Sequence, residues 1–596
     1  MKNELKQERT MKDSKLFSRL FTYMRPYIKE YIGGILLMCL IVGCDVVSPY
    51  IFSLSLKELG KEIIDFKIVI MLFVGGVLLT VIMHVLQYFQ TMLMNTTGNK
   101  IIYKVRQDVF NHIQSLSHHQ FNEIPVGTLV TRNTSDTNVL YSLYTNVILN
   151  ILKYIVTIIG VLIAMFLLNW KLALIILAMF PIIVTLTVLF RTILRKIHRT
   201  VRNEVSSMNA FLSENISGIK TTQIFNQESK KYKEFKNANE RLKKASLREI
   251  FTFGIFRPMV YLIYIITVIL ILYTGGNEFI KFSIGALAVA ITYNELYAFY
   301  QFISKFFNPI QALADQYNTL QSAFAAAEKI FTILDIEPEI KDSEDAIDID
   351  LKGEIEFKDV WFSYVENEWI LKGVSFKINP KDVVAFVGAT GAGKSTILGL
   401  ITRNYDIQKG QILIDGIDIK KIKLSSLRGQ IGQMLQDVFL FSGTIEENIR
   451  LNDESISVDE IKRACDEVNA THFINRQADG LQAIVGERGN NLSLGERQLI
   501  SFARVIVHKP KVMILDEATS NIDTETEVLI QDSLEKVIQK NTMIMVAHRL
   551  STIQHANKIF VFDHGSIIES GNHQELLRLR GRYYQLYQLQ YQRNNI

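Results

Sequence analysis

The sequence predicts a chain of two parts: an α-helical membrane domain over residues 1–335 and an α/β domain over residues 352–596, joined by a linker at residues 336–351. Three observations support this fold class. The chain has 596 residues, too many for one hydrophobic core. Its mean hydropathy is +0.16 and only 21% of its residues are charged, which indicates that part of it lies in lipid. Apolar runs of helix length fill the first half, and shorter runs of strand length fill the second.

Six apolar runs are long enough to cross a membrane, since about 20 residues span about 30 Å of hydrocarbon. They are residues 31–52, 68–88, 147–168, 172–190, 256–273 and 284–307. Only residues 169–171 separate the third run from the fourth, so a tight hairpin is expected there. The sixth run is diluted by Thr292, Asn294 and Glu295.

Two connections between these runs are long, at residues 89–146 and 191–255. Both keep helical periodicity and contain few prolines, so we expect the spans to continue as helices about 40 Å beyond the membrane. The second connection has an excess of lysine and arginine, and Arg25 and Lys29 precede the first span. Because positive residues near span ends favour the cytoplasm, we expect a multi-pass protein of the cell membrane with both termini and the α/β domain in the cytoplasm.

Charge and cysteine content exclude several classes of protein. The net charge of +5 follows the membrane pattern and forms no basic stripe, so no nucleic acid partner is expected. Cys39, Cys44 and Cys465 have no metal-ligand spacing, which excludes a disulfide framework or a zinc site. The polar residues 1–15 lack the apolar core of a signal peptide, so the first span is expected to be retained.

Six runs of strand length alternate with helical segments after residue 351, which predicts a mainly parallel sheet. They are residues 354–357, 383–387, 412–414, 512–515, 543–546 and 558–562.

The second strand run is followed at once by a glycine-rich segment and then by a helical one. The segment contains Gly388, Ala389, Thr390, Gly391, Ala392, Gly393, Lys394, Ser395 and Thr396. This is the phosphate-binding loop pattern in the strand–loop–helix setting that it requires. Its backbone N–H groups are expected to close around the phosphates of ATP. Lys394 is expected to reach the β- and γ-phosphates, and Ser395 to ligate Mg²⁺.

Paired carboxylates, Asp516 and Glu517, end the strand run at residues 512–515. At the carboxyl edge of a parallel sheet both would lie beside the phosphate loop. Asp516 is then expected to hold the Mg²⁺ shell, and Glu517 to polarise the attacking water.

The segment Leu492-Ser-Leu-Gly-Glu-Arg-Gln498, together with the phosphate loop and His548, resembles the ATP-binding cassette (ABC) transporters, specifically exporters with fused membrane and ATPase domains. The resemblance covers nearly the whole chain and implies further roles. Tyr364 is similar to the aromatic residue that stacks on adenine, and Gln436 to the glutamine that senses Mg²⁺ and the γ-phosphate. His548 is similar to the histidine that contacts the γ-phosphate. Other matching segments are the exporter-specific 485–489, Asp523 at the dimer interface, and the coupling helices at 121–127 and 216–225.

In this family two cassettes close head to tail, so that each ATP lies between one phosphate loop and the signature segment of the other subunit. Ser493 and Gly495 therefore imply contacts to the partner's nucleotide. This signature departs from the family pattern at Leu494, which replaces glycine, and Glu496, which replaces glutamine and adds negative charge. The intact Glu517 beside an altered signature predicts a heterodimer. The partner, a second half-transporter, is expected to lack the catalytic glutamate.

Two carboxylates, Asp45 and Glu295, lie inside expected spans, where charge is costly. They either line the path of a cationic substrate or have a structural role, and the sequence leaves both open.

The function expected from these features is ATP-driven export of small amphipathic molecules, drugs or lipids, by alternating access. An ATP-gated channel or regulatory subunit, and a homodimeric lipid or peptide exporter, are the alternatives. The intact Glu517 speaks against a channel that needs no hydrolysis.

Overall fold

The computed structural model describes residues 11–283, 292–435, 437–516, 541–546 and 553–594. The chain forms two compact units. The membrane unit comprises Met1–Gln114 and Val126–Ile336. The cassette unit comprises Glu337–Ile596 together with the short segment Ser115–Pro125.

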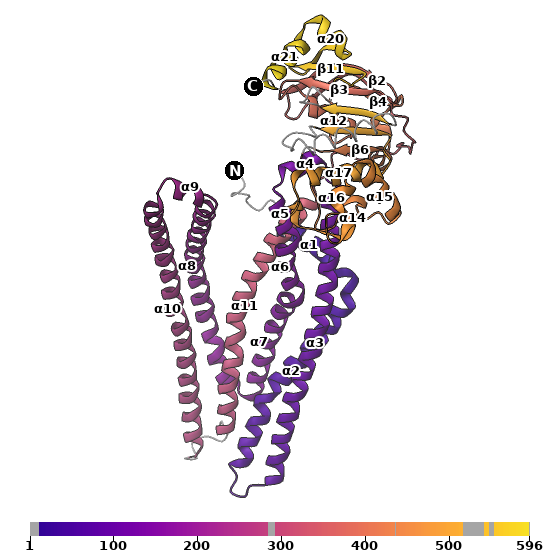
Figure 1. Cartoon of the computed structure of the whole chain (residues 1–596). Helices are drawn as coiled ribbons and strands as arrows, with labels where there is room; N and C mark the ends of the chain where they lie inside the picture. Colours follow the sequence, from indigo (N-terminus) through magenta and orange to yellow (C-terminus); the bar gives the residue numbers. More distant parts are fainter. Residues whose placement is uncertain (1–10, 284–291, 436, 517–540, 547–552, 595–596) are drawn as a thin grey trace. The chain divides into compact units, whose positions relative to one another are not determined.

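The membrane unit consists of helices (Figure 1). They are α1 (Asp13–Met24), α2 (Ile28–Leu59), α3 (Phe66–Ser115), α5 (Val126–Thr131), α6 (Thr137–Ser142), α7 (Ile148–Leu168), α8 (Trp170–Ser217), α9 (Ile219–Ile224), α10 (Glu228–Ser283) and α11 (Tyr293–Leu334). A 3₁₀ turn at Arg25–Tyr27 precedes α2, and π-helical turns at Arg132–Asp136 and Leu143–Val147 flank α6.

Five stretches among the described residues are long and apolar enough to cross a membrane. They are Asp13–Leu59, Phe66–Ser115, Val126–Leu168, Trp170–Ser217 and Glu228–Glu278. Residues 284–291 of the expected sixth span lie outside the described residues, and α11 begins at Tyr293. At 50, 48 and 56 residues, α3, α8 and α10 far exceed the about 20 residues that cross a bilayer. These helices therefore extend well beyond the hydrocarbon.

The hairpin between α7 and α8 is as tight as the spacing predicts. Asn169 separates the two helices and caps α8, since its side chain accepts hydrogen bonds from Lys171 N and Leu172 N at 3.0 and 3.3 Å. Further along, α8 and α10 lie side by side and α9 joins their ends (Figure 1).

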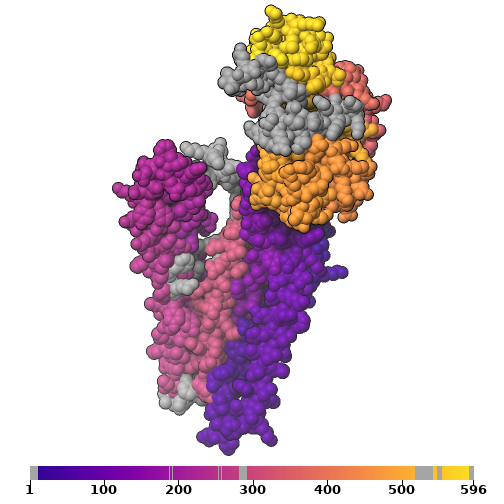
Figure 2. Space-filling model, in the orientation of Figure 1, coloured from indigo at the N-terminus to yellow at the C-terminus, as the bar shows by residue number. Residues whose placement is uncertain are grey.

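Apolar side chains are distributed differently over these helices. In the most apolar window of α3 no residue is buried, so this helix offers its apolar side chains to lipid; α2 and α3 form much of the indigo surface in Figure 2. In contrast, α11 packs a buried face against α7, α8 and α10. That face contains Ala298, Phe299, Phe302, Ile303, Phe306 and Phe307.

Three sheets build the cassette unit (Figure 1). The central sheet has the order β12-β11-β3-β10-β9-β6, with β12 antiparallel to β11 and the other pairs parallel. Its strands are β3 (Val383–Gly388), β6 (Ile431–Met434), β9 (Val512–Asp516), β10 (Thr542–Val546), β11 (Lys558–Asp563) and β12 (Ser566–Gly571). An antiparallel sheet has the order β2-β1-β4-β5, with β1 (Ile355–Ser363), β2 (Trp369–Ile378), β4 (Lys409–Ile414) and β5 (Ile417–Asp418). A third, small sheet pairs β7 (Gly443–Thr444) with β8 (Ile484–Val485).

Helices cover these sheets in the cassette unit. They are α4 (His118–Glu123), α12 (Lys394–Ile401), α13 (Leu424–Gly429), α14 (Ile445–Arg450), α15 (Val458–Glu467), α16 (Thr471–Ile474), α17 (Leu494–Val507), α20 (His573–Leu579) and α21 (Arg582–Asn594). Short 3₁₀ turns occur at Ile419–Lys421, Gly480–Gln482 and Glu487–Gly489.

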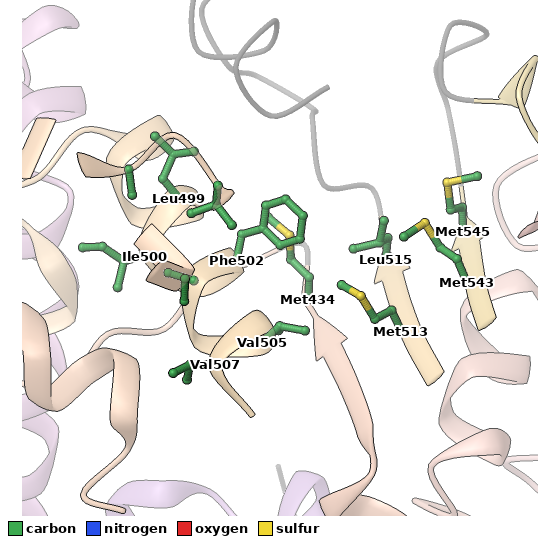
Figure 3. Close-up of a cluster of buried hydrophobic side chains, with 14 of the residues drawn as sticks. Met434, Leu499, Ile500, Phe502, Val505, Val507, Met513, Leu515, Met543 and Met545 are labelled. Atoms are coloured by element: carbon green, nitrogen blue, oxygen red, sulfur yellow. The ribbon is translucent and has the colours of Figure 1, made fainter. Parts of the chain in front are cut away.

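The central sheet separates two hydrophobic cores, because successive side chains on a strand point to opposite faces. Met513, Leu515, Met543 and Met545 face the core that includes α17, as Figure 3 shows. Val512, Ile514, Ile544 and Val546 face the other core, which includes β1, β2 and α12. Strands buried on both faces explain the continuous apolar runs in the sequence.

Candidate nucleotide site

The phosphate loop joins the buried strand β3 to α12, as the strand–loop–helix pattern predicts. Gly391 and Gly393 have φ of 82° and 100°, in the left-handed region that favours glycine. A Cβ on Gly393 would also come within 2.8 Å of Leu371 Cδ2, so a larger residue would disturb the loop. The loop is therefore built for close approach of its backbone to a ligand.

The ammonium of Lys394 lies across this loop. The side chain is 6% exposed, and its Nζ donates hydrogen bonds to the carbonyls of Gly388 and Ala389 at 2.8 and 3.0 Å. Ser395 follows at the start of α12 and is exposed, whereas Thr396 is buried. This arrangement holds a positive charge beside backbone N–H groups at a helix N-terminus, which favours phosphate.

Strand register aligns the other expected ATP-site positions with this loop. Val546 of β10 is the register partner of Phe386 in β3 and of Asp516 in β9. Asp516 therefore ends its strand at the edge where the phosphate loop begins. Gln436, Glu517 and His548 come one or two residues after the ends of β6, β9 and β10 in the sequence, but all three lie outside the described residues, as does Asp523.

The donor set fits a magnesium ion held mainly by a nucleotide. Mg²⁺ prefers oxygen ligands and is usually bound through one or two protein groups together with phosphates and water. The Ser395 hydroxyl and the Asp516 carboxylate are such groups. Among the described residues no cluster of three His, Cys, Asp or Glu side chains could hold a metal alone, so an ion here would depend on the phosphates.

Tyr364, the expected adenine-stacking residue, belongs to an aromatic cluster beside α12. It is 42% exposed, and its hydroxyl lies 3.1 Å from the Thr396 hydroxyl. Its ring meets Tyr405 edge-on at a centroid distance of 5.1 Å and Phe362 at 4.9 Å. An exposed aromatic face next to a phosphate loop can stack on a base.

Tyr405, which the sequence gives no reason to single out, connects this cluster to α4. Its ring lies 6.1 and 6.4 Å from those of His118 and His119, measured between ring centroids. Burial, followed by the neighbouring Tyr364, raises the pKa of the Tyr405 phenol, so the hydroxyl stays protonated at neutral pH. A cavity of about 270 Å³ lies here, lined by His119, Tyr364 and Tyr405 among others.

Helix α4 is also bonded to the segment that leads into the cassette. Ser117 Oγ donates to Glu339 Oε2 at 2.8 Å, and Gln120 Nε2 donates to the carbonyl of Glu337 at 2.7 Å. His119 Nδ1 lies 3.2 Å from Glu339 Oε1. The expected coupling segment at 121–127 thus includes the end of α4, while the segment at 216–225 includes α9 of the membrane unit.

The signature segment starts α17, with Ser493 as its N-cap. Ser493 Oγ accepts a hydrogen bond from Glu496 N at 3.2 Å, and Ser493 N donates to Glu496 Oε2 at 2.8 Å. This reciprocal pair is a capping box, and it places the Glu496 carboxylate at the helix N-terminus. Leu494 is half-buried and Gly495 is buried.

In the membrane unit the two carboxylates of the expected spans have partners. Glu295 Oε2 accepts from Thr292 N at 3.0 Å and completes a capping box at the start of α11. Asp45 of α2 forms an ion pair with Lys305 of α11. Lys305 was not singled out from the sequence, although a lysine within an expected span was the available signal.

A helical membrane unit joined to a cassette that carries a phosphate loop and a signature helix defines an ABC-type exporter subunit. The family model described as "ABC transporter transmembrane region" matches residues 31–310, and the one described as "ABC transporter" matches residues 371–520. The chain belongs to the ABC transporter family. It is a multi-pass membrane protein of the cell membrane, and its ATPase is coupled to export.

Relatives of this chain cover nearly its full length. The uncharacterized ABC transporter ATP-binding protein YknV of Bacillus subtilis (strain 168) is 38% identical, over 96% of this chain and 94% of its own. The probable multidrug resistance protein YheH of the same organism is 39% identical, over 85% and 74%. The ATP-dependent lipid A-core flippase of Syntrophus aciditrophicus is 32% identical, over 98% and 95%.

A solved structure has the same fold. It is described as a bacterial Atm1-family ABC exporter with ATP bound, and it matches with a TM-score of 0.76 and 26% identity, over 95% of this chain and 98% of that one. The six-span exporter fold followed by an ABC ATPase domain is thereby confirmed. As a half-transporter, the chain works as a dimer.

Proposed function

We propose that this chain is one half of a heterodimeric exporter of amphipathic drugs or lipids, with one consensus and one degenerate ATP site. The consensus site pairs this chain's phosphate loop, Asp516 and Glu517 with the partner's signature. The degenerate site pairs this chain's altered signature with the phosphate loop of a partner that lacks the catalytic glutamate.

The capping box between Ser493 and Glu496 carries this proposal. The backbone N–H of Ser493 and the positive end of α17 are already directed at a carboxylate 2.8 Å away. A γ-phosphate approaching this helix from the partner's site would meet that negative charge, and like charges a few ångströms apart repel. The same chain keeps the full phosphate loop, so the defect concerns only the partner's nucleotide.

At the consensus site each residue has a separate task. The loop backbone and Lys394 bind the phosphates, and Tyr364 stacks on the base. Ser395, Asp516 and Gln436 would hold Mg²⁺, which neutralises phosphate charge when bound. Glu517 accepts a proton from the attacking water, and His548 contacts the γ-phosphate.

The names of the relatives support the cargo class. One is described as a probable multidrug resistance protein and another as a lipid A-core flippase, which are the two cargo classes of this proposal. The polar groups that α11 carries within the membrane unit can contact the polar part of such a molecule.

Purification with and without the second half-transporter tests the heterodimer. We expect the chain alone to bind ATP but to show little ATPase stimulation by amphipathic compounds, and the pair to be stimulated several-fold. A homodimer of this chain with full transport-coupled ATPase activity would contradict the proposal. That outcome would favour the homodimeric lipid or peptide exporter.

A further inference from the structure

A partly exposed ion pair joins two helices of the membrane unit. Lys305 Nζ of α11 bonds to Asp45 Oδ1 of α2, although 260 residues separate the two in sequence. The Asp45 side chain is 36% exposed and that of Lys305 24%. The second carboxylate oxygen, Oδ2, has no hydrogen-bond partner among the described residues, so the carboxylate can accept a further bond.

The pair lies at one end of a seam between the two antiparallel helices. Residue numbers across this seam add to a nearly constant value, as regular antiparallel packing requires. Its other contacts are the ring stack of Phe52 on Tyr297 at 5.0 Å, the bond from Asn294 Nδ2 to Ser53 Oγ at 3.2 Å, and the bond from the Tyr293 hydroxyl to the carbonyl of Leu56. Asp45 lies seven residues before the expected end of the first span at residue 52, about 10 Å along the helix. Asp45 therefore lies within the first expected span.

Polar side chains of α11 lie beside the pair. On α11, Tyr297, Gln301, Ser304 and Asn308 share one face at helical spacing, and Lys305 borders it. Gln301 Nε2 donates to the Tyr297 hydroxyl at 2.9 Å, and Asn308 Nδ2 donates to Ser304 Oγ at 3.3 Å. Polar and charged groups at this depth are too costly to point into hydrocarbon, so they line a water-accessible path or an interface.

Both helices are weakened next to the pair. Pro49 of α2 has no N–H to donate to the carbonyl of Asp45, and Pro309 of α11 has none for the carbonyl of Lys305. Each charged residue thus precedes a proline by four positions, where a helix bends most easily. A ligand that changes the spacing of the two side chains acts directly on these two bending points.

We propose that Asp45 and Lys305 form the head-group site for zwitterionic amphipathic substrates, an inference that rests on the proposed export function. A zwitterion opens one ion pair and forms two, because its anion pairs with Lys305 and its cation with Asp45. No charge is left alone. A cation that binds Asp45 leaves the ammonium of Lys305 without a partner. An anion that binds Lys305 leaves the carboxylate of Asp45 without one. An unpaired charge away from water is costly in either case.

Substrate binding at this seam is coupled to a conformational change of α2 and α11. Inserting a head group between Asp45 and Lys305 separates α2 from α11 beside Pro49 and Pro309. A ligand shifts a conformational equilibrium only by its different affinity for the two states, and here the state with separated side chains has room for the head group.

This site is tested by the head-group charge that the transporter prefers in its substrates. The chain is reconstituted together with its partner half-transporter. ATPase stimulation is measured in lipid nanodiscs with decylphosphocholine, decyltrimethylammonium and decyl sulfate, which share one chain and differ in head group. The wild type should respond to the phosphocholine at a concentration about tenfold below that of the other two. Lys305→Gln should shift the preference to the ammonium, Asp45→Asn to the sulfate, and the double variant should lose all preference.

A matched control is Glu278→Gln, which breaks the exposed ion pair between Lys171 and Glu278 at 2.9 Å and should leave the preference unchanged. The double variant keeps the test informative if a single variant folds poorly, because it leaves no lone charge. Unchanged head-group preference in both the single and the double variants overturns this site alone. If none of the three amphipaths stimulates the wild-type transporter, the export of amphipathic molecules fails with it.

Discussion

At the scale of single residues, Glu496 stabilises its own helix and opposes a ligand. As the third helical residue of α17 it completes the capping box with Ser493, an arrangement of about 1 kcal/mol. Glutamine at this position can make the same two bonds without the charge. The family's usual residue therefore gives the same local structure and differs from Glu496 only in its charge.

This similarity makes Glu496→Gln a clean test of the charge. With the cap kept and the repulsion removed, we expect the partner's nucleotide to bind about fivefold more tightly, equivalent to about 1 kcal/mol. Binding of a fluorescent ATP analogue to the heterodimer measures the change. Glu496→Ala is the control: it also removes the charge but loses the cap, so it should tighten binding while lowering the thermal stability of the cassette. Unaltered affinity in both variants would mean that the carboxylate does not face the nucleotide.

At the scale of elements, α4 and the phosphate-loop helix α12 are connected through aromatic rings. The connection runs from Thr396 to Tyr364, from there to Tyr405, and on to His118 and His119 in α4. Because α4 lies between the ends of α3 and α5 in the chain, a shift at the adenine-stacking residue can be passed to the long helices. We assign Tyr405 a positioning role in this connection.

Tyr405→Ala should uncouple the ATPase from its cargo. Removing the ring leaves the phosphate loop intact, so we expect basal ATPase activity within about twofold of the wild type, with most of the stimulation by substrate lost. Tyr405→Phe keeps the ring and should restore most of the stimulation. Trp369→Ala serves as the control. It removes a ring that packs on Trp361 with a centroid distance of 5.6 Å, away from α4. Equal loss of stimulation in Trp369→Ala and Tyr405→Ala would contradict a specific role for Tyr405.

The sequence predicted these elements where periodicity is strong. The fully buried strands β3, β9, β10 and β11 were found because both faces are apolar. Strand β2 at Trp369–Ile378 has no continuous apolar run and was missed, although its alternation of apolar and polar residues is the pattern of a strand buried on one face. Side-chain partners were beyond prediction: Asp45 and Lys305 meet across 260 residues, and Ser117 and Glu339 across 222. No local pattern encodes such pairs, since the packing of whole helices creates them.

At the scale of the whole molecule, the proposed dimer has two different ATP sites, and this asymmetry requires a second, different chain. In a homodimer every residue of the chain occurs twice, so each substitution alters both ATP sites. In the proposed heterodimer, Lys394 serves only the consensus site and Ser493 only the degenerate one. The homodimer and the heterodimer therefore differ in how a single substitution affects the activity of the dimer.

Substitutions at Lys394 and Ser493 separate the two dimers. In the heterodimer, Lys394→Ala removes the phosphate-binding ammonium from the only hydrolysing site, so ATPase activity and transport should fall at least about 100-fold. Ser493→Ala alters only the degenerate site, so activity should stay within about threefold of the wild type. The Oγ of Ser493 bonds within α17, and loss of that cap costs stability of about 1 kcal/mol, which thermal unfolding measures separately. In a homodimer both variants damage every site, so a collapse of activity in Ser493→Ala comparable to that in Lys394→Ala, with the fold intact, would exclude the asymmetric arrangement.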